Sequence, residues 1–296
     1  MYPRSFHYHR AASLEEAVSM LSSLGAEARL LAGGQSLIPL MKLRLTAPQH
    51  LVDLNFAPGL SYIDSAGSQL RIGAMTRHSE LEASAGARRI PILHDCAAGI
   101  ADVQVRNRGT LGGSLAEADP TGDWAPVLLS LGAEVVCLGP QGQRLLPLAS
   151  FLKDAFTTAL APAELVREVI VKTPPKQSGG AYLAFKSCAP VYAAASAAVQ
   201  LTLDNGVCAS AGIFLGAVGL TPVHAQEAEA ALTGKPVNEK SVAAAEAAAA
   251  ACDPPADLRG SKDFKRALVR ALVTRALDAA HRRARGESVE VSHLYA

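Results

Sequence analysis

This chain contains the segments Leu31-Ala32-Gly33-Gly34-Gln35-Ser36-Leu37 and Arg106-Asn107-Arg108-Gly109-Thr110-Leu111-Gly112-Gly113-Ser114-Leu115, each built around a double glycine. Apolar residues flank both segments, so neither is typical of a solvated linker. Glycine reaches positive φ without a side-chain clash and lets consecutive N–H groups converge on one anion. The two segments therefore predict close approach of the backbone to a phosphate-bearing cofactor.

Composition predicts an ordered globular protein with room for two domains. The chain has 296 residues, of which 49% are hydrophobic, and a formal net charge of +1. A near-neutral charge gives no basic surface for nucleic acid, so we expect no nucleic-acid partner. The weakly polar stretch 209–223 is too short for a bilayer span, and the N-terminus has no apolar signal region, so we expect no membrane span and a cytoplasmic location.

The five cysteines predict no metal or iron–sulfur site within this chain. Cys96, Cys137, Cys188, Cys208 and Cys252 are widely spread, and no C-x-x-C pair occurs. Free cysteines are commonly small buried hydrophobic residues, which is the role expected for most of them.

The N-terminal half alternates helix and strand patterns. Ser13 and Glu16 have the spacing of a capping box before a helix that ends at Gly25. The sequence then predicts strands at 28–31, 51–54 and 70–74, helices at 79–85, 90–102 and 124–131, and a hairpin of 134–138 with 145–148. This order is typical of α/β architecture.

The C-terminal half predicts an α+β domain. Prolines and glycines in 173–180 indicate a linker. Asn205-Gly206 between apolar runs predicts a hairpin of 194–203 with 207–215, followed by helices at 222–232 (capped by Thr221), 238–251 and 262–283 (capped by Ser261). The arginines near the end of the last helix have two interpretations, a partner-docking surface or favourable placement at the helix dipole: Arg275, Arg282, Arg283 and Arg285.

The familiar nucleotide and hydrolase motifs are missing. No G-x-G-x-x-G follows a predicted strand, and the sequence has no P-loop, no H-E-x-x-H and no G-x-S-x-G. Asp119 and Asp123 form a carboxylate pair near the second glycine segment. For Asp119, capping of its own turn and contact with a cofactor are equal alternatives, whereas for Asp123 cofactor contact is favoured.

Together the two segments closely resemble the FAD-binding medium subunit of bacterial molybdenum hydroxylases, the carbon monoxide dehydrogenase and xanthine dehydrogenase family. The resemblance covers nearly the whole chain and includes Val52-Asp53-Leu54, Ile72-Gly73-Ala74-Met75-Thr76, Asp204-Asn205-Gly206, Leu215-Gly216-Ala217-Val218 and Leu258-Arg259-Gly260-Ser261. It implies an α+β fold. An FAD-binding domain over 1–175, made of two α/β subdomains (about 1–55 and 56–175) like those of vanillyl-alcohol oxidase and para-cresol methylhydroxylase, precedes an antiparallel sheet with helices over 179–290.

The resemblance also implies which residues contact FAD. Residues of the two glycine segments would surround the phosphates and the ribityl chain and bind them largely through backbone N–H groups. These residues are Leu31, Ala32, Gly33, Gly34, Gln35, Ser36, Leu37, Thr110, Leu111, Gly112, Gly113 and Ser114. Other positions that match cofactor contacts are Ile100, Asp119, Asp123, Val166, Lys186 and Tyr192. Lys186 would lie near the flavin ring and Tyr192 beside it, and no side chain of this chain would act as a catalytic nucleophile.

The sequence departs from the family pattern at two places. Glu117 stands where histidine or asparagine is frequent, and a negative charge beside an anionic cofactor predicts that it points away. Ser187-Cys188-Ala189-Pro190 replaces a more basic stretch that borders the flavin in the resembling proteins.

The resemblance implies a relay of electrons. A large subunit would hold molybdopterin, a small subunit would hold two 2Fe-2S clusters, and electrons would pass through FAD on this chain to an external acceptor, with a dimer of heterotrimers as the assembly. The alternatives are a stand-alone FAD-dependent oxidoreductase of the same superfamily, for which no substrate-polarising set of residues is evident, and a scaffold without cofactor, against which the intact double glycines argue.

Overall fold

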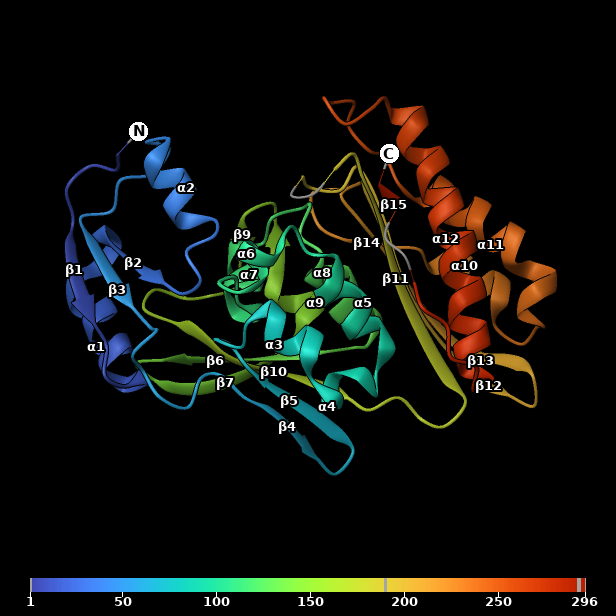
Figure 1. The fold of residues 1–296 in the computed structure, drawn as a ribbon, viewed down its shortest axis with the longest axis horizontal. Helices are drawn as coiled ribbons and strands as arrows, with labels where there is room; N and C mark the ends of the chain where they lie inside the picture. The colour runs from blue at the N-terminus through green and yellow to red at the C-terminus, as the bar shows by residue number, and fades with distance from the viewer. Residues whose placement is uncertain (1, 189–190, 292–293, 296) are drawn as a thin grey trace.

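The computed structural model describes residues 2–188, 191–291 and 294–295. Three main sheets follow one another along the chain (Figure 1), with a small sheet at one end of the molecule, a second sheet in the middle and a third sheet between two groups of helices. The two glycine segments belong to the first and second of these parts.

The first part is a three-stranded parallel sheet with strand order β1 (His7–Arg10), β3 (His50–Asp53) and β2 (Ala28–Leu31). Helix α1 (Leu14–Leu24) begins where the Ser13 hydroxyl accepts the Glu16 N–H at 3.1 Å, as predicted. Its buried Ala17 and Val18 pack in one cluster with Val52 of β3. Helix α2 (Leu37–Lys42) directly follows the first glycine segment.

The second part is an antiparallel five-stranded sheet that carries a group of short helices. Its strand order is β4 (Ile63–Ala66), β5 (Gln69–Gly73), β10 (Leu165–Lys172), β6 (Glu134–Gly139) and β7 (Gly142–Pro147). The helices between β5 and β6 are α3 (His78–Ala83), α4 (Ala85–Arg88), α5 (Pro91–Gly99), α6 (Val103–Arg106), α7 (Leu111–Glu117) and α8 (Trp124–Ser130). Helix α9 (Leu148–Phe151) and the small pair β8 (Leu152–Asp154) and β9 (Thr157–Thr158) follow β7.

The third part is a five-stranded sheet with order β14 (Val223–His224), β13 (Val207–Gly216), β12 (Ala195–Asp204), β11 (Ser178–Lys186) and β15 (Leu294–Tyr295). Strand β11 is buried on both faces. Tyr182 and Ala184 join the core formed with α5 and α8, whereas Ala181 and Leu183 face the core of the C-terminal helices, as the two-residue period of a strand requires. Those helices are α10 (Gln226–Leu232), α11 (Val237–Ala251) and α12 (Lys262–Ala284).

The structure confirms the predicted fold class of an N-terminal domain of the FAD-binding type followed by a sheet with helices. The predicted hairpin is present, with positive φ at Asn205 (49°) and Gly206 (83°). The sheet is antiparallel except for β15, which pairs in parallel with β11.

Two local predictions are wrong. Helix α10 begins at Gln226 and not at Pro222, because Val223 and His224 pair with β13 as strand β14. Gly179 and Gly180 are part of strand β11 and not of a loose linker. A Cβ on Gly179 would lie 2.1 Å from the Ala280 carbonyl oxygen, so Gly179 allows α12 to pack closely on the strand.

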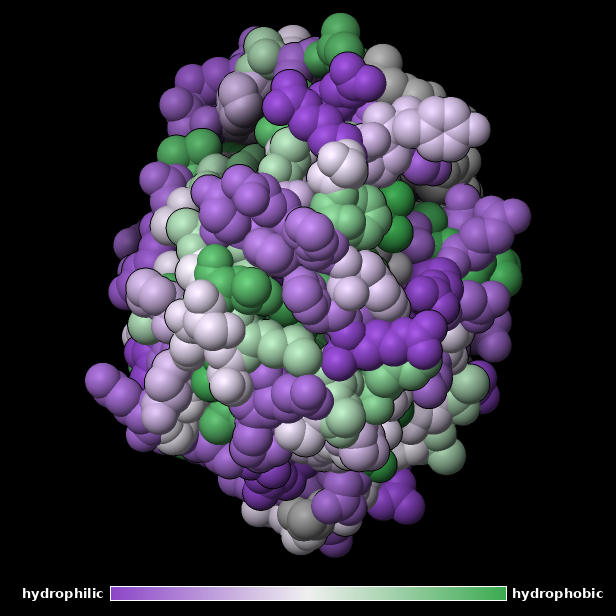
Figure 2. Space-filling model, turned by 90° about the vertical axis from the view of Figure 1, so that its left-hand side faces the viewer, coloured by the Kyte–Doolittle hydropathy of each residue, from purple (hydrophilic) through white to green (hydrophobic). Residues whose placement is uncertain are grey.

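Four of the five cysteines are buried as expected, and Cys188 is exposed. Among the described residues, none of the helices has the length and apolar character needed to cross a bilayer. Figure 2 shows the face on the side of the first sheet, where hydrophilic side chains cover most of the surface and hydrophobic ones form small separate patches.

Candidate functional site

A cavity of about 830 Å³ lies where the three parts of the chain meet. The first glycine segment, the second glycine segment, the loop before β10 and the end of β11 all contribute to its lining. Its volume is in the range of roughly 300–1,000 Å³ that small-molecule and cofactor sites occupy. This cavity is the candidate functional site.

The first glycine segment offers unpaired backbone donors to the cavity. In the part of the chain that the structure describes, none of the N–H groups in 33–37 donates a hydrogen bond to a protein acceptor. Gly34 has a φ of 75°, in the left-handed region that glycine tolerates. A row of free N–H groups around such a turn forms a concave site for an anion, as the sequence predicted.

The second glycine segment leads into helix α7. It forms the first turn of α7, where the Thr110 hydroxyl accepts the Gly113 N–H at 3.2 Å. The N–H groups of Leu111, Gly112 and Ser114 also donate to protein oxygens, those of Thr76, Ala74 and Thr110 in turn. Each N–H group of 111–114 thus has a protein acceptor, and contact of this segment with the cofactor stays a prediction.

Glycines of both segments permit close contact between distant parts of this chain. A Cβ on Gly33 would lie 2.2 Å from the Arg108 carbonyl oxygen, and a Cβ on Gly112 would lie 2.5 Å from the Ala74 Cβ. The two glycine segments are thus pressed against each other, and only glycine allows that distance. This contact brings the first and second parts of the chain together at the cavity.

Nearly all the predicted cofactor residues line the cavity. They are Ala32, Gly33, Gly34, Gln35, Ser36, Leu37, Ile100, Thr110, Gly112, Gly113, Ser114, Asp119, Asp123, Val166, Lys186 and Tyr192. The two exceptions are Leu31 and Leu111. Leu31 ends strand β2, and Leu111 is fully buried in the core under α7.

A buried ion pair forms part of the cavity wall. The Lys186 ammonium donates to the Gly99 carbonyl oxygen at 2.7 Å and lies 3.2 Å from the Asp123 carboxylate. The Tyr182 hydroxyl donates to the same carboxylate at 2.7 Å. Because Asp123 balances its charge, Lys186 does not present an isolated positive charge to the cavity.

His78 also lines the cavity and was not among the predicted residues. The Trp124 indole N–H donates to its Nδ1 at 3.1 Å. Burial lowers the pKa of His78 from 6.5 to about 4, although Asp123 opposes this shift. The imidazole is therefore neutral at physiological pH.

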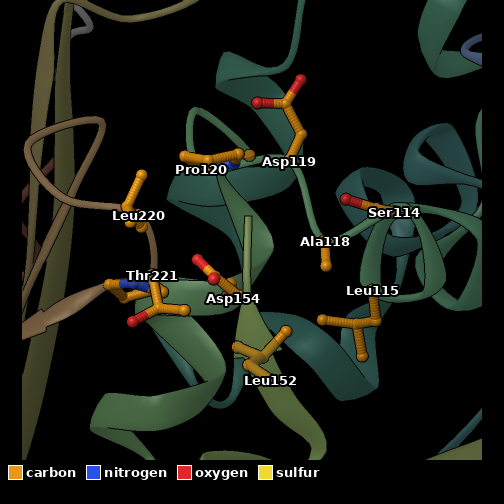
Figure 3. A pocket seen from close by; sticks show the side chains of 12 residues that line it. Ser114, Leu115, Ala118, Asp119, Pro120, Leu152, Asp154, Leu220 and Thr221 are labelled. Carbon is orange, nitrogen blue, oxygen red and sulfur yellow. The ribbon is translucent and has the colours of Figure 1, made fainter. Parts of the chain in front are cut away.

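Asp119 caps its own turn. One oxygen of its carboxylate accepts from the Thr121 N–H at 2.8 Å and from the Thr121 hydroxyl at 2.7 Å. Figure 3 shows a small hollow beside the main cavity, in which the Asp119 carboxylate points away from the other labelled side chains and Leu220 and Thr221 of the third part face Asp154. Capping is thus present, and cofactor contact by Asp119 stays a prediction.

Two residues at the cavity bear on the departures from the family pattern. Glu117 is among the residues that line the cavity, and burial together with Asp119 raises its pKa; that its side chain points away from the cofactor stays a prediction. Tyr192 is about half exposed (49%), and the Arg259 guanidinium lies 5.9 Å from the centre of its ring. Of the unusual stretch 187–190, Ala189 and Pro190 lie outside the described residues.

Comparison with known families agrees with this geometry. The family described as the FAD binding domain in molybdopterin dehydrogenase matches residues 4–174, and the CO dehydrogenase flavoprotein C-terminal domain matches residues 180–280. The chain belongs to the FAD-binding family of molybdopterin dehydrogenases.

Individual members of this FAD-binding family resemble the chain over almost its full length. The carbon monoxide dehydrogenase medium chain of Afipia carboxidovorans is 40% identical over 96% of this chain and 100% of its own. The 6-hydroxypseudooxynicotine dehydrogenase complex subunit alpha of Paenarthrobacter nicotinovorans is 40% identical over 99% of this chain and 100% of its own. These relatives are oxidoreductase subunits, as expected from the sequence.

Solved structures show the same fold. A carbon monoxide dehydrogenase from Hydrogenophaga pseudoflava that lacks the Mo-pyranopterin moiety of its cofactor superposes with a TM-score of 0.93 at 42% identity, covering 96% of this chain and 99% of that chain. Quinoline 2-oxidoreductase from Pseudomonas putida 86 superposes with a TM-score of 0.90 at 34% identity, covering 96% of this chain and 99% of that chain.

The cavity fits the FAD that membership of this family implies. The free N–H groups of 33–37 suit the pyrophosphate, and the volume of about 830 Å³ suits a dinucleotide. Buried Ile100 and Val166 supply apolar wall for a flat ring system. The cavity is therefore the candidate FAD site of this chain.

Proposed function

We propose that this chain is the electron-transfer subunit of a heteromeric molybdenum hydroxylase, passing electrons from 2Fe-2S clusters on a partner through FAD to an external acceptor. The observation that carries the proposal is the cavity itself: free backbone donors at one end, an ion pair with balanced charge in the wall, and a family match over both halves of the chain. Bound FAD supplies the redox chemistry, and the protein supplies placement and electrostatics.

The residues of this chain have separate tasks in the proposal. The N–H groups of 33–37 bind the pyrophosphate, and the contact of Gly33 with Arg108 holds this loop against the segment between α6 and α7. The Lys186 and Asp123 pair holds the end of β11 beside the ring system without adding net charge. The second glycine segment shapes the cavity through α7 and does not bind through its paired N–H groups.

The partners are inferred from the relatives. Those relatives are named as medium chains or as subunits of dehydrogenase complexes. We infer a large subunit with molybdopterin and a small subunit with two 2Fe-2S clusters, assembled as a dimer of heterotrimers. The domain boundary near 175–179 and the cytoplasmic location belong to the same inference.

Dependence on partners distinguishes this proposal from a stand-alone oxidoreductase. The FAD-loaded chain is mixed anaerobically with candidate reductants (carbon monoxide, an aldehyde, a purine and another N-heterocycle), alone and within its complex, and flavin absorbance is followed. We expect bleaching by a substrate only in the complex. Bleaching at the same rate by the chain alone would overturn the relay assignment.

Tyr192 is proposed to control access of the external acceptor. It lines the cavity, is half exposed, and has the Arg259 guanidinium 5.9 Å from the centre of its ring, so it is reachable from both the cavity and the solvent. Replacement of Tyr192 by Ala is expected to speed reoxidation of the reduced flavin by a small acceptor such as dioxygen, with FAD affinity nearly unchanged. An unchanged reoxidation rate would remove Tyr192 from this role.

A further inference from the structure

His78 occupies an unusual position in the wall of the cavity. It begins α3, and only 5% of its surface is exposed. Its Nδ1 accepts a hydrogen bond from the Trp124 indole N–H at 3.1 Å, and Trp124 is itself fully buried. The imidazole therefore has one nitrogen fixed by the protein core.

The contact with Trp124 determines which nitrogen of His78 carries the proton. An indole N–H is a donor and never an acceptor, so Nδ1 of His78 must offer a lone pair. Burial keeps the ring neutral by lowering its pKa to about 4. A neutral imidazole with a free lone pair on Nδ1 has its proton on Nε2.

The Nε2–H group has no acceptor within the described residues. It lies against Gly109, where an added Cβ would be 2.6 Å from Nε2. Within the described residues, Gln200 Oε1 is the only fully buried side-chain nitrogen or oxygen atom without a hydrogen-bond partner. Nε2 of His78 also has no partner but is not such a buried atom, so it is in contact with open space. Both His78 and Gly109 line the large cavity, and that space is the cavity.

A donor that faces the cavity and has no protein acceptor can donate to an acceptor of a ligand bound there. FAD is rich in acceptors, with phosphate, ribityl and ring oxygens and unprotonated ring nitrogens. We propose that the Nε2–H group of His78 donates a hydrogen bond to an acceptor of bound FAD, and that Trp124 is the positioning residue that selects the required tautomer. This inference rests on the FAD site described above.

Affinity of the full-length chain for FAD tests the contact. His78→Phe keeps a planar ring but removes the N–H donor, whereas His78→Gln keeps a donor. We expect His78→Phe to raise the Kd for FAD about tenfold, the loss of one hydrogen bond, and His78→Gln to raise it less. Flavin fluorescence titration measures both values, and an unchanged Kd in the Phe variant would overturn the proposal.

A double-mutant cycle tests the role of Trp124. Trp124→Phe removes the indole N–H, and we expect it to weaken FAD binding severalfold when His78 is present. In a chain that already carries His78→Phe, the same change should cost no further affinity. Additive losses would show that Trp124 acts through packing and would overturn its positioning role.

The tautomer can be observed without any change to the fold. In the ¹⁵N NMR spectrum of histidine-labelled wild-type chain, the His78 signals are those missing from the His78→Phe spectrum. We expect a proton on Nε2, and a shift of that N–H signal when FAD is added. A proton on Nδ1, or a signal that does not respond to bound FAD, would contradict the proposal, whereas failure of the wild-type chain to bind FAD would overturn the FAD site as well.

Discussion

Replacement of Arg283 by Gln should be one of the most destabilising single changes in this chain. Arg283 near the end of α12 makes a paired contact with the Asp95 carboxylate on α5, at 2.6 and 2.9 Å, with side chains only 8% and 3% exposed. It also donates to the carbonyl oxygens of Gly180 and Val289. For Arg283 the two interpretations from the sequence, a partner-docking surface and favourable placement at the helix dipole, are both replaced by an internal contact. Arg283 joins α12 to α5, which lies over the second sheet.

The expected loss follows from the burial of the pair. Removing one partner of a buried ion pair costs about 3–5 kcal/mol, since the remaining charge loses its oppositely charged neighbour in the interior. For a chain of this size the loss corresponds to a fall in Tm of roughly 6–20 °C. Thermal unfolding followed by circular dichroism measures it.

The adjacent arginine provides a matched control. Arg282 pairs with Glu287 at 2.7 Å, but both side chains are largely exposed (46% and 41%). Exposed pairs contribute only about 0–1 kcal/mol, so Arg282→Gln should hardly change Tm. Equal shifts for the two variants would refute the reasoning, because Arg283 is buried with hydrogen bonds to Asp95, Gly180 and Val289, whereas the Arg282 pair is exposed to solvent.

Three further changes probe the site and its support. Gly113 lines the cavity, and a Cβ there would lie 2.7 Å from the Thr110 hydroxyl oxygen and 3.7 Å from the Ala32 Cβ, so Gly113→Val should abolish FAD retention by filling space beside the first glycine segment. Gly86→Val, whose added Cβ meets only side-chain atoms at 3.3 Å or more, should retain FAD. Flavin occupancy after gel filtration compares the two variants, and full occupancy of Gly113→Val would show that FAD does not occupy the space beside Gly113. The folded-state pKa of His78 is lowered from 6.5 to about 4, so between these pH values the unfolded chain binds a proton that the folded chain does not. The free energy of unfolding should therefore fall by about 3 kcal/mol as the pH is lowered from 6.5 to 4. Denaturation of His78→Phe over the same pH range should lack this part of the loss. Burial alone would raise the pKa of Glu168, but hydrogen bonds from Arg71 and Tyr62 lower it below 4.5. The stability advantage of the wild type over Glu168→Gln should therefore be fully present above about pH 4.5 and be lost as the pH falls through the folded-state pKa. An advantage that does not change with pH would contradict this prediction.

The parts of the fold that could be predicted from the sequence have local causes. Helix α1 begins at the Ser13 cap, helix α12 at the Ser261 cap, and the hairpin turns at Asn205-Gly206, each within a few residues of its signal. Most of the cofactor residues that the family resemblance implied line the cavity for the same reason, because the glycine segments are continuous in the sequence. Short elements such as β14 had no such signal, since their strands form only through pairing with a distant partner.

The properties that escaped prediction depend on residues far apart in the chain. His78 and Trp124 are 46 positions apart, and Arg283 and Asp95 are 188 positions apart, so no local pattern connects either pair. The role of Gly33 was missed for a similar reason. Its double glycine predicted an approach of the backbone to a ligand, but the close neighbour of Gly33 is the backbone of the second segment, at Arg108.

In the proposed function, this chain holds FAD and receives electrons from iron–sulfur clusters on other chains. The most direct test is the visible absorption spectrum of the tagged chain, purified from its native host both alone and with the chains that accompany it. We predict flavin bands in both preparations and additional iron–sulfur absorption only when the accompanying chains are present. Absence of flavin from both preparations would contradict the FAD assignment, and a flavin-bearing solitary chain that turns over a substrate would contradict the relay.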